Sequence, residues 1–413
     1  MPQQDRKPNF IVVFMDDMGY GDMGCFGSPS IKTPRMDAIA ENGAKFTQMY
    51  AAGPICTPSR CGLLTGRYPQ RVGLPAVLFP HDTAGLTDHE KTIADRLGPA
   101  GYASCCLGKW HLGCLPEHYP TRHGFDYYFG LLYSNDMNPL HLYRNEEVIE
   151  TEVDQAQLTR RYTDEAIAFI EQHKDQPFFC YLAHTMPHIP LHVEEEFRGK
   201  SDGGTYGDTI ECIDYHLGRI MDKLDELGLA DDTLLIVTSD NGPWFEGSTA
   251  GLRGRKFDCY EGGVRMPFVA QWPGTLSPGT VLDEPMSLMD LLPTFCCLAG
   301  IEPPRDPDVD GIDICGAFRN GGSPQRDALY YYLLYRLQAV RAGKWKLHVE
   351  RGVNGDTMEM PQLFDMDRDP GENYNVANRY PEVVEKLAAM IKKFDEEATA
   401  EREAHGRYWK ENT

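Results

Sequence analysis

Short apolar runs alternate with amphipathic segments along most of this chain. Four runs rich in β-branched and aromatic residues have the length and continuous hydrophobicity of buried parallel strands. Apolar residues at helical spacing between and after them predict flanking helices. This alternation predicts an α/β fold with a large, mostly parallel central sheet flanked by helices. The expected strands of this kind are residues 9–15, 102–107, 177–183 and 233–238, with a further strand at 266–272. The main helices are 34–46, 159–173, 209–227 and 288–298.

The pattern changes near residue 325. Short aromatic or alternating segments follow one another with brief turns, and an amphipathic helix is expected at 381–397. A length of 413 residues also favours one large domain plus a smaller one. We therefore divide the chain into an α/β domain, residues 1–325, and a C-terminal subdomain, residues 326–413, with a small antiparallel sheet and a helix. The charge-rich residues 396–413 are expected to fray.

Two of the predicted strands end in acidic residues. Asp16 and Asp17 follow the first strand, and Asp240 and Asn241 follow the strand at 233–238. The carboxyl ends of parallel strands are where α/β folds bind ligands, and adjacent carboxylates repel unless a cation lies between them. Four oxygen donors describe a hard-cation site, and its crowded carboxylates favour Ca²⁺ over Mg²⁺ and exclude zinc. For either pair taken alone, a solvated strand end is an equally good interpretation.

Cys56 lies in the stretch AAGPICTPSRCGLLTGRYP. Pro58 is compatible with the first turn of a helix, so Cys56 is expected at a helix N-terminus, where free N–H groups favour an anion. Arg60 lies one turn further on the same face. A sulfur atom, a helix N-terminus and an arginine together predict an anion pocket, and the alternative for Cys56 is a buried structural thiol.

The string Cys56-Thr57-Pro58-Ser59-Arg60, followed by Thr65-Gly66-Arg67, is similar to the signature of type I sulfatases. These are formylglycine-dependent, arylsulfatase-like enzymes of the alkaline-phosphatase superfamily. The strings GKWHLG at 108–113 and YEGG at 260–263 also resemble family motifs in the family's order. The resemblance implies that a formylglycine-generating enzyme oxidises Cys56 to formylglycine. It also implies that the modified Cys56 joins Asp16, Asp17, Asp240 and Asn241 around the metal.

The resemblance further assigns basic residues to the sulfate group. Lys109 and His111 lie two residues apart at a strand end. In an extended segment their side chains are expected to point to the same side, as they would in a binding site. By family position, His188 would protonate the leaving alcohol and His111 would assist the second step. The catalytic set it implies is Cys56, Arg60, Lys109, His111, His188 and Lys256. Weaker substrate-binding candidates are Ser134, Asp136, Asn138 and Arg265, with turn residues as the alternative for Asp136 and Asn138.

The reaction implied by the resemblance is hydrolysis of a sulfate monoester. A hydroxyl of the hydrated formylglycine would attack sulfur, and a sulfo-enzyme intermediate would then release inorganic sulfate after the alcohol has left. The polar loop at 134–144 suggests an exo-acting enzyme for a small sugar sulfate of the galactose or N-acetylgalactosamine type. One alternative is a phosphodiesterase or phosphonate monoester hydrolase of the same superfamily. Another is a non-catalytic sulfated-glycan-binding protein with unmodified Cys56.

Composition adds several limits. The formal net charge of −22 argues against nucleic acid as a partner and requires a locally positive site for an anionic substrate. We expect no membrane span, because no apolar run reaches roughly 18 residues. The twelve cysteines show no zinc-type spacing, so most are expected to be reduced thiols. No signal-peptide pattern is present, so we expect a cytoplasmic protein as the sequence stands, or a periplasmic or secreted one if a leader was removed.

Overall fold

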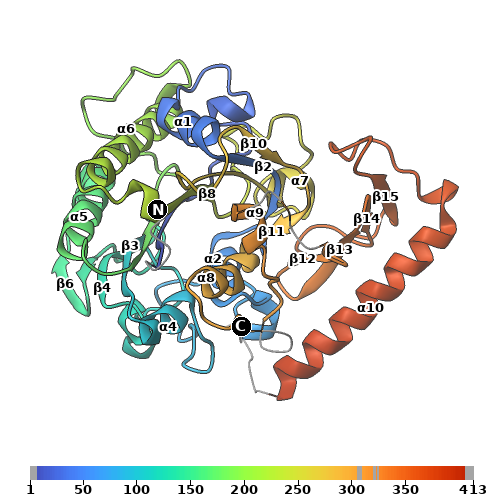
Figure 1. Ribbon diagram of the computed structural model, residues 1–413. Coiled ribbons are helices and arrows are strands. Elements are labelled where there is room, and N and C mark those ends of the chain that lie inside the picture. The colour runs from blue at the N-terminus through green and yellow to red at the C-terminus, as the bar shows by residue number, and fades with distance from the viewer. Residues whose placement is uncertain (1–6, 305–308, 320–321, 323–324, 405–413) are drawn as a thin grey trace.

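The computed structural model describes residues 7–304, 309–319, 322 and 325–404. Its centre is a large mixed sheet in the order β10-β2-β9-β8-β1-β7-β3-β4-β5-β6, with β11 paired to β2 (Figure 1). The middle five strands, β8 to β4, are parallel to one another. The strands are β1 (Asn9–Met15), β2 (Ala44–Tyr50), β3 (Ala103–Lys109), β4 (Tyr127–Leu131), β5 (Leu142–Arg144), β6 (Glu147–Glu150), β7 (Phe178–Ala183), β8 (Thr233–Ser239), β9 (Arg265–Gln271), β10 (Thr280–Leu282) and β11 (Met286–Ser287).

Helices cover both faces of this sheet. Side chains of β1 alternate between two cores: Phe10 and Phe14 pack with α2, α4 and α8, whereas Ile11 and Val13 pack with α1, α5 and α6. Burial on both faces explains why the central strands are continuously apolar. The helices are α1 (Pro34–Asn42), α2 (Cys56–Thr65), α3 (Pro69–Val72), α4 (Ile93–Leu97), α5 (Leu158–Gln172), α6 (Gly204–Glu226), α7 (Glu261–Val264), α8 (Leu291–Leu298), α9 (Cys315–Arg319) and α10 (Pro381–Ala404).

A four-stranded antiparallel sheet and α10 make up the C-terminal part (Figure 1). Its strands are β12 (Leu329–Leu333), β13 (Arg336–Ala342), β14 (Trp345–His348) and β15 (Gln362–Asp365). This part shares one apolar cluster with Ala52, Tyr68 and Met289 of the large domain. The predicted α/β class with a small antiparallel sheet and a helix is therefore confirmed, while the boundary at residue 325 stays a prediction. Within the described residues, the helices include none that is both long and apolar enough to cross a membrane.

Two sequence-based expectations are wrong. The helix predicted at 34–46 ends at Asn42, and residues 44–46 begin strand β2, because that segment pairs with β9 in the sheet. Such pairing outweighs a local helical pattern. The fraying expected from residue 396 does not occur up to Ala404, since Ala398 is buried and Glu401 pairs with Arg71 at 2.6 Å. The remaining residues of that prediction, 405–413, lie outside the described residues.

Candidate active site

The two acidic strand ends meet at one edge of the central sheet. Strands β1 and β8 are parallel neighbours with Met15 opposite Ser239, so the residues that follow each strand lie side by side. The Asp17 N–H donates to Asp240 Oδ1 at 3.0 Å, and the Asn241 side-chain amide donates to Asp17 Oδ1 at 2.6 Å. Asp16, Asp17, Asp240 and Asn241 are all buried. The structure thus brings together the four oxygen donors predicted from residues more than two hundred positions apart.

Three buried cationic side chains surround these carboxylates. Arg60 lies 2.8 Å from Asp240 Oδ2 and 3.4 Å from Asp16 Oδ1. Lys109 Nζ lies 2.6 Å from Asp16 Oδ2, and Lys256 Nζ lies 2.7 Å from Asp17 Oδ2. Three cations therefore face three carboxylates, so the site is near neutral before a metal ion is counted. A divalent cation would give the site a net positive charge, so an anionic substrate could bind there although the protein as a whole is acidic.

The donor set fits a hard divalent cation. Asp16 Oδ1 and Asn241 Oδ1 are buried and accept no hydrogen bond from the described residues. Ligand atoms of Asp16, Cys56 and Asp240 lie within 4.8 Å of one another, and so do those of Asp17, Cys56 and His188. Buried oxygens without donors are costly unless a cation or water satisfies them. Carboxylate and amide oxygens are the ligands that Ca²⁺ and Mg²⁺ prefer.

The carboxyl groups of Asp16 and Asp240 differ in how readily they ionise. Burial and the neighbouring Asp16 carboxylate raise the pKa of Asp240 to about 7. Burial acts on Asp16 in the same direction, but Lys109, His188, Arg60 and Lys256 outweigh it and hold the pKa of Asp16 well below its ordinary value. Within the cluster, the Asp240 carboxyl is therefore harder to ionise than the Asp16 carboxyl.

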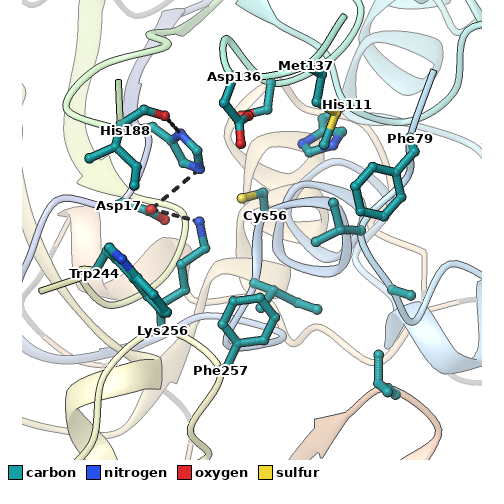
Figure 2. A pocket seen from close by; sticks show the side chains of 16 residues that line it. Asp17, Cys56, Phe79, His111, Asp136, Met137, His188, Trp244, Lys256 and Phe257 are labelled. Atoms are coloured by element: carbon teal, nitrogen blue, oxygen red, sulfur yellow. Dashed lines mark hydrogen bonds and ion pairs between the residues drawn. The ribbon is translucent and has the colours of Figure 1, made fainter. Parts of the chain in front are cut away.

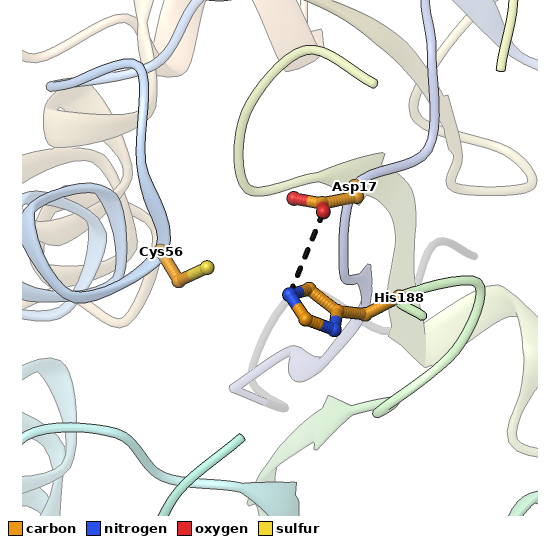
Figure 3. Close-up of side chains that lie close together, drawn as sticks. All are labelled: Asp17, Cys56 and His188. Carbon is orange, nitrogen blue, oxygen red and sulfur yellow. Dashed lines mark ion pairs between the residues drawn. The ribbon is translucent and has the colours of Figure 1, made fainter. Parts of the chain in front are cut away.

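Cys56 begins α2, as predicted, and points into this cluster. Its side chain faces Asp17 and His188 (Figure 3). Burial raises the pKa of the Cys56 thiol to about 12, despite the opposing effect of Lys109 and Lys256. The residue would therefore be a neutral thiol at physiological pH, a poor nucleophile. This property argues against direct thiol catalysis by an unmodified cysteine.

Two histidines border the same space, and they carry their hydrogen on different ring nitrogens. His111 Nε2 lies 2.9 Å from the Leu78 carbonyl, which fixes the hydrogen on Nε2 and leaves Nδ1 with no partner among the described residues. His188 Nδ1 lies 2.5 Å from the Ile189 carbonyl and 3.1 Å from Asn135 Oδ1, so its Nδ1 carries the hydrogen. Burial lowers the pKa of both imidazoles, helped at His111 by Lys109 and Arg60. A lowered pKa favours the neutral form of both rings near pH 7.

A cavity of about 440 Å³ opens above Cys56 (Figure 2). Asp17, Cys56, His111, His188 and Lys256 occupy its floor and walls. Its volume lies in the range of small-molecule pockets. Aromatic side chains form much of the remaining wall, and Phe79 and Phe257 are 45% and 38% exposed. The other lining residues include Ser134, Asp136, Met137, Ile189 and Trp244.

Comparisons with known proteins identify the family. The family model for Sulfatase matches residues 8–301, and the model for N-sulphoglucosamine sulphohydrolase, C-terminal, matches residues 253–397. Human arylsulfatase A is 37% identical over 93% of this chain and 87% of its own length. The chain belongs to the sulfatase family. It is a type I sulfatase of the alkaline-phosphatase superfamily, as the motifs predicted, and hydrolyses sulfate esters.

Two further relatives extend this similarity. The pig (Sus scrofa) N-acetylgalactosamine-6-sulfatase is 34% identical over 95% of this sulfatase and 86% of its own length. The solved structure of Ps i-CgsB in complex with k-i-k-neocarrahexaose has a TM-score of 0.85 and 30% identity. It covers 94% of this chain and 93% of its own. A formylglycine residue and a divalent metal are typical of the family.

The sulfatase brings two of its four predicted substrate residues to the cavity. Ser134 accepts a hydrogen bond from Lys109 at 3.1 Å, and Asp136 lines the cavity wall. Asn138 is exposed and lies outside the cavity lining. Arg265 also lies outside it, because its guanidinium donates to the Thr47 carbonyl at 2.6 Å and pairs with Glu261 at 3.3 Å. The structure therefore does not place Asn138 or Arg265 against a substrate in the cavity.

Asn135 is a site residue that was not predicted from the sequence. Its side-chain oxygen contacts His188 Nδ1, and its amide nitrogen donates to the Pro190 carbonyl at 3.0 Å and to Gln155 Oε1 at 3.1 Å. Those two acceptors fix the orientation of the amide, so its oxygen faces the imidazole. Asn135 follows Ser134 in the polar loop, but nothing in a single sequence distinguishes it from an ordinary turn residue.

Proposed function

We propose that this sulfatase is an exo-acting carbohydrate sulfatase that uses formylglycine at position 56 and Ca²⁺. The observation that carries the proposal is the cavity above Cys56, which combines aromatic walls with one exposed carboxylate, Asp136. No described residue donates a hydrogen bond to Asp136, so it is free to accept one from a sugar hydroxyl. An aryl leaving group offers no such donor.

The ligands for the cation would be Asp16, Asp17, Asp240 and Asn241, together with the group at position 56. When bound, the cation supplies positive charge at the ester oxygens, and hydrated formylglycine supplies a nucleophilic oxygen. Ca²⁺ suits a crowded set of protein oxygens better than Mg²⁺, which keeps several waters. Asp16 Oδ1 and Asn241 Oδ1, which accept no hydrogen bond from the described residues, support a cation at this place.

The basic residues neutralise the sulfate group. Lys109 Nζ lies 2.6 Å from the Asp16 carboxylate, and Lys256 Nζ lies 2.7 Å from the Asp17 carboxylate. A cation held by these carboxylates would share their negative charge, and both ammonium groups would then be able to bind the ester oxygens. Arg60 holds Asp240 and the Lys109 carbonyl in place, at 2.8 and 3.0 Å. Charge neutralisation of this kind is the main requirement for attack on a negatively charged ester.

The two histidines divide the proton transfers. His111 has its hydrogen fixed on Nε2, so its free Nδ1 lone pair is suited to take a proton from the group at position 56 in the second step. His188 has its hydrogen on Nδ1, so Nε2 is the atom that faces the ligand side, 3.7 Å from Asp17 Oδ2. The negative charge of a bound ester favours a proton on Nε2, which His188 then donates to the leaving alcohol.

The relatives support a sugar as the alcohol. The curated relatives include an N-acetylgalactosamine-6-sulfatase, and Ps i-CgsB was solved with a neocarrahexaose. A cavity of about 440 Å³ has room for a terminal sugar rather than for a long internal stretch of glycan. The apolar C–H face of a pyranose can pack on Phe79, Trp244 or Phe257, while Asp136 binds a hydroxyl. A galactose or N-acetylgalactosamine sulfate meets both requirements.

The test has two parts. First, the protein is produced with a formylglycine-generating enzyme, and the peptide containing Cys56 is expected to be lighter by about 18 Da than the thiol form. Second, sulfate release is measured from galactose 6-sulfate, N-acetylgalactosamine 6-sulfate and 4-nitrophenyl sulfate. We expect a higher kcat/KM for a sugar sulfate. Asp136→Ala should lower kcat/KM about 10-fold on the sugar and less than about twofold on the aryl ester.

Asn138→Ala is the matched control, because Asn138 lies in the same loop but outside the cavity. It should leave both substrates unaffected. Turnover of the aryl ester alone by protein with modified Cys56 would refute the sugar assignment. An equal effect of Asp136→Ala on both substrates would refute the role of Asp136. An unmodified thiol after co-production with the maturation enzyme would contradict the formylglycine assignment itself.

A further inference from the structure

Cys297 and Cys315 lie next to each other, away from the active site. Cys297 is on α8, Cys315 begins α9, and their sulfur atoms are 3.0 Å apart. This separation is shorter than a van der Waals contact between two sulfur atoms. Both residues are partly exposed, so a soluble reagent can reach them. Cys105 and Cys180 also face each other across β3 and β7, but both are fully buried.

Asp313 is the third member of this cluster. Its carboxylate accepts the backbone N–H of Cys315 at 2.8 Å, and one ligand atom from each of Cys297, Asp313 and Cys315 lies within 4.8 Å of the others. A metal ion is therefore one chemical possibility. However, two thiolates on a tetrahedral zinc, with Zn–S near 2.3 Å, lie about 3.8 Å apart. The observed separation is closer, and a structural zinc site needs four ligands, whereas the described residues supply three here.

We propose that Cys297 and Cys315 form a disulfide bond when the protein meets an oxidising pool of low-molecular-weight disulfides. The bond would join α8 to α9 and close the chain between them. Its sulfur atoms need only a small approach to reach bonding distance. The proposal does not depend on the proposed substrate or on the state of Cys56.

The bond would restrain the segment before Cys315, and residues 310–311 of this segment bind the C-terminal end of α2, the helix that begins at Cys56. The N–H groups of Asp310 and Gly311 donate to the Gly66 carbonyl at 2.8 and 2.9 Å, just beyond the C-terminal end of α2. The Asp310 carboxylate accepts the Tyr68 N–H at 2.8 Å. Residues 310–311 thus bind the end of α2 opposite to Cys56. A covalent link at Cys315 would restrict the freedom of this segment in the unfolded chain, and hence stabilise the fold.

The oxidation is a thiol–disulfide exchange with glutathione disulfide as the co-reactant. One protein thiolate attacks a sulfur atom of glutathione disulfide, which forms a mixed disulfide and releases one glutathione thiolate. The second protein thiol loses its proton and displaces the second glutathione. The protein loses two hydrogens, and the oxidant is reduced to two thiols. Burial, with Cys315 and Asp313 nearby, raises the pKa of Cys297, so we expect slow exchange at neutral pH.

The experiment treats the full chain with glutathione disulfide, alkylates the remaining thiols and analyses peptides without reduction. We expect one linked peptide pair containing Cys297 and Cys315, lighter by about 2 Da than the sum of its reduced parts. Cys105 and Cys180 should remain thiols. The melting temperature of the oxidised protein should exceed that of the reduced protein by roughly 3–4 °C.

Cys297→Ser and Cys315→Ala should each abolish the linked peptide and the shift in melting temperature. Cys25→Ser is the matched control, because Cys25 is another partly exposed cysteine, and this variant should keep both effects. Complete alkylation of Cys297 and Cys315 after the oxidant would overturn the proposal. So would a link from either residue to a different cysteine. Protection of both thiols by Zn²⁺ that is reversed by EDTA, without any linked peptide, would overturn it in favour of a metal site.

Discussion

Replacing Lys346 by methionine tests how the C-terminal sheet is tied to the active site. Lys346 on β14 is fully buried, and its ammonium group lies 2.9 Å from Glu261 and 3.2 Å from Glu372. Glu261 begins α7, five residues after Lys256. Glu261 also accepts the Tyr50 hydroxyl at 2.7 Å. The ion pair therefore joins the small sheet to the loop that carries an active-site lysine.

The expected cost follows from burial. Without Lys346, two carboxylates with essentially no exposure lose their closest common cation. Removing one partner of a buried ion pair costs about 3–5 kcal/mol. We expect the lower end here, because Arg265 still pairs with Glu261 at 3.3 Å and His348 still contacts Glu372 at 2.7 Å. Lys344→Met is the matched control two residues away on the same hairpin. Its side chain is 44% exposed and pairs with Asp365 at 2.8 Å, so its loss should cost less than about 1 kcal/mol.

The assay is urea unfolding of the two variants and the parent protein, followed by tryptophan fluorescence near pH 7.5. The free energy of unfolding should fall far more for Lys346→Met than for Lys344→Met. Sulfate release by Lys346→Met should also decline, because the Lys256 loop loses an anchor. If both lysine variants lose the same small amount of stability, the argument from buried charge is refuted.

Three further predictions concern charge, positioning and metal. Burial opposes ionisation of Glu261, but Lys346, Arg265 and Arg341 hold its pKa at about 2, below the ordinary 4.5. The contribution of ionised Glu261 to the free energy of unfolding should be complete above pH 4.5 and be lost as the pH falls towards 2. In urea unfolding at different pH values, Glu261→Gln should flatten that part of the stability–pH curve. Asn135→Ala should lower kcat about 10-fold with little change in KM, since it removes a hydrogen bond that orients His188; steady-state kinetics in which only KM changes would contradict this. Dialysis against EDTA should abolish sulfate release, and Ca²⁺ should restore it better than Mg²⁺; full activity of protein shown by elemental analysis to be metal-free would argue against a metal centre.

Much of the site could be predicted from local sequence. Asp16 and Asp17 follow a continuously apolar run, and Asp240 and Asn241 follow another, so both pairs were expected at strand ends. The parallel pairing of β1 with β8 then puts these ends together. Cys56 was expected at a helix N-terminus, and α2 begins there. These predictions succeed because strand length, burial and helix starts depend mainly on residues close in sequence.

Other features depended on contacts between distant segments. Residues 44–46 carry a helical pattern but form a strand, because β9 lies beside them. Arg265 was expected near the substrate but turns to Glu261 and Thr47. Asn135 orients His188 only because the loop after β4 packs against the loop after β7.

The sequence by itself therefore determined the family, the α/β class and the residue types at the catalytic centre. Tertiary structure alone decided which polar side chains face the cavity and which pair with one another elsewhere. The physical reason is that a buried charge or hydrogen-bonding group takes whichever partner the packing brings within reach. The arrangement of strands and loops decides which partner that is, and the local sequence around Arg265 or Asn135 does not predict it.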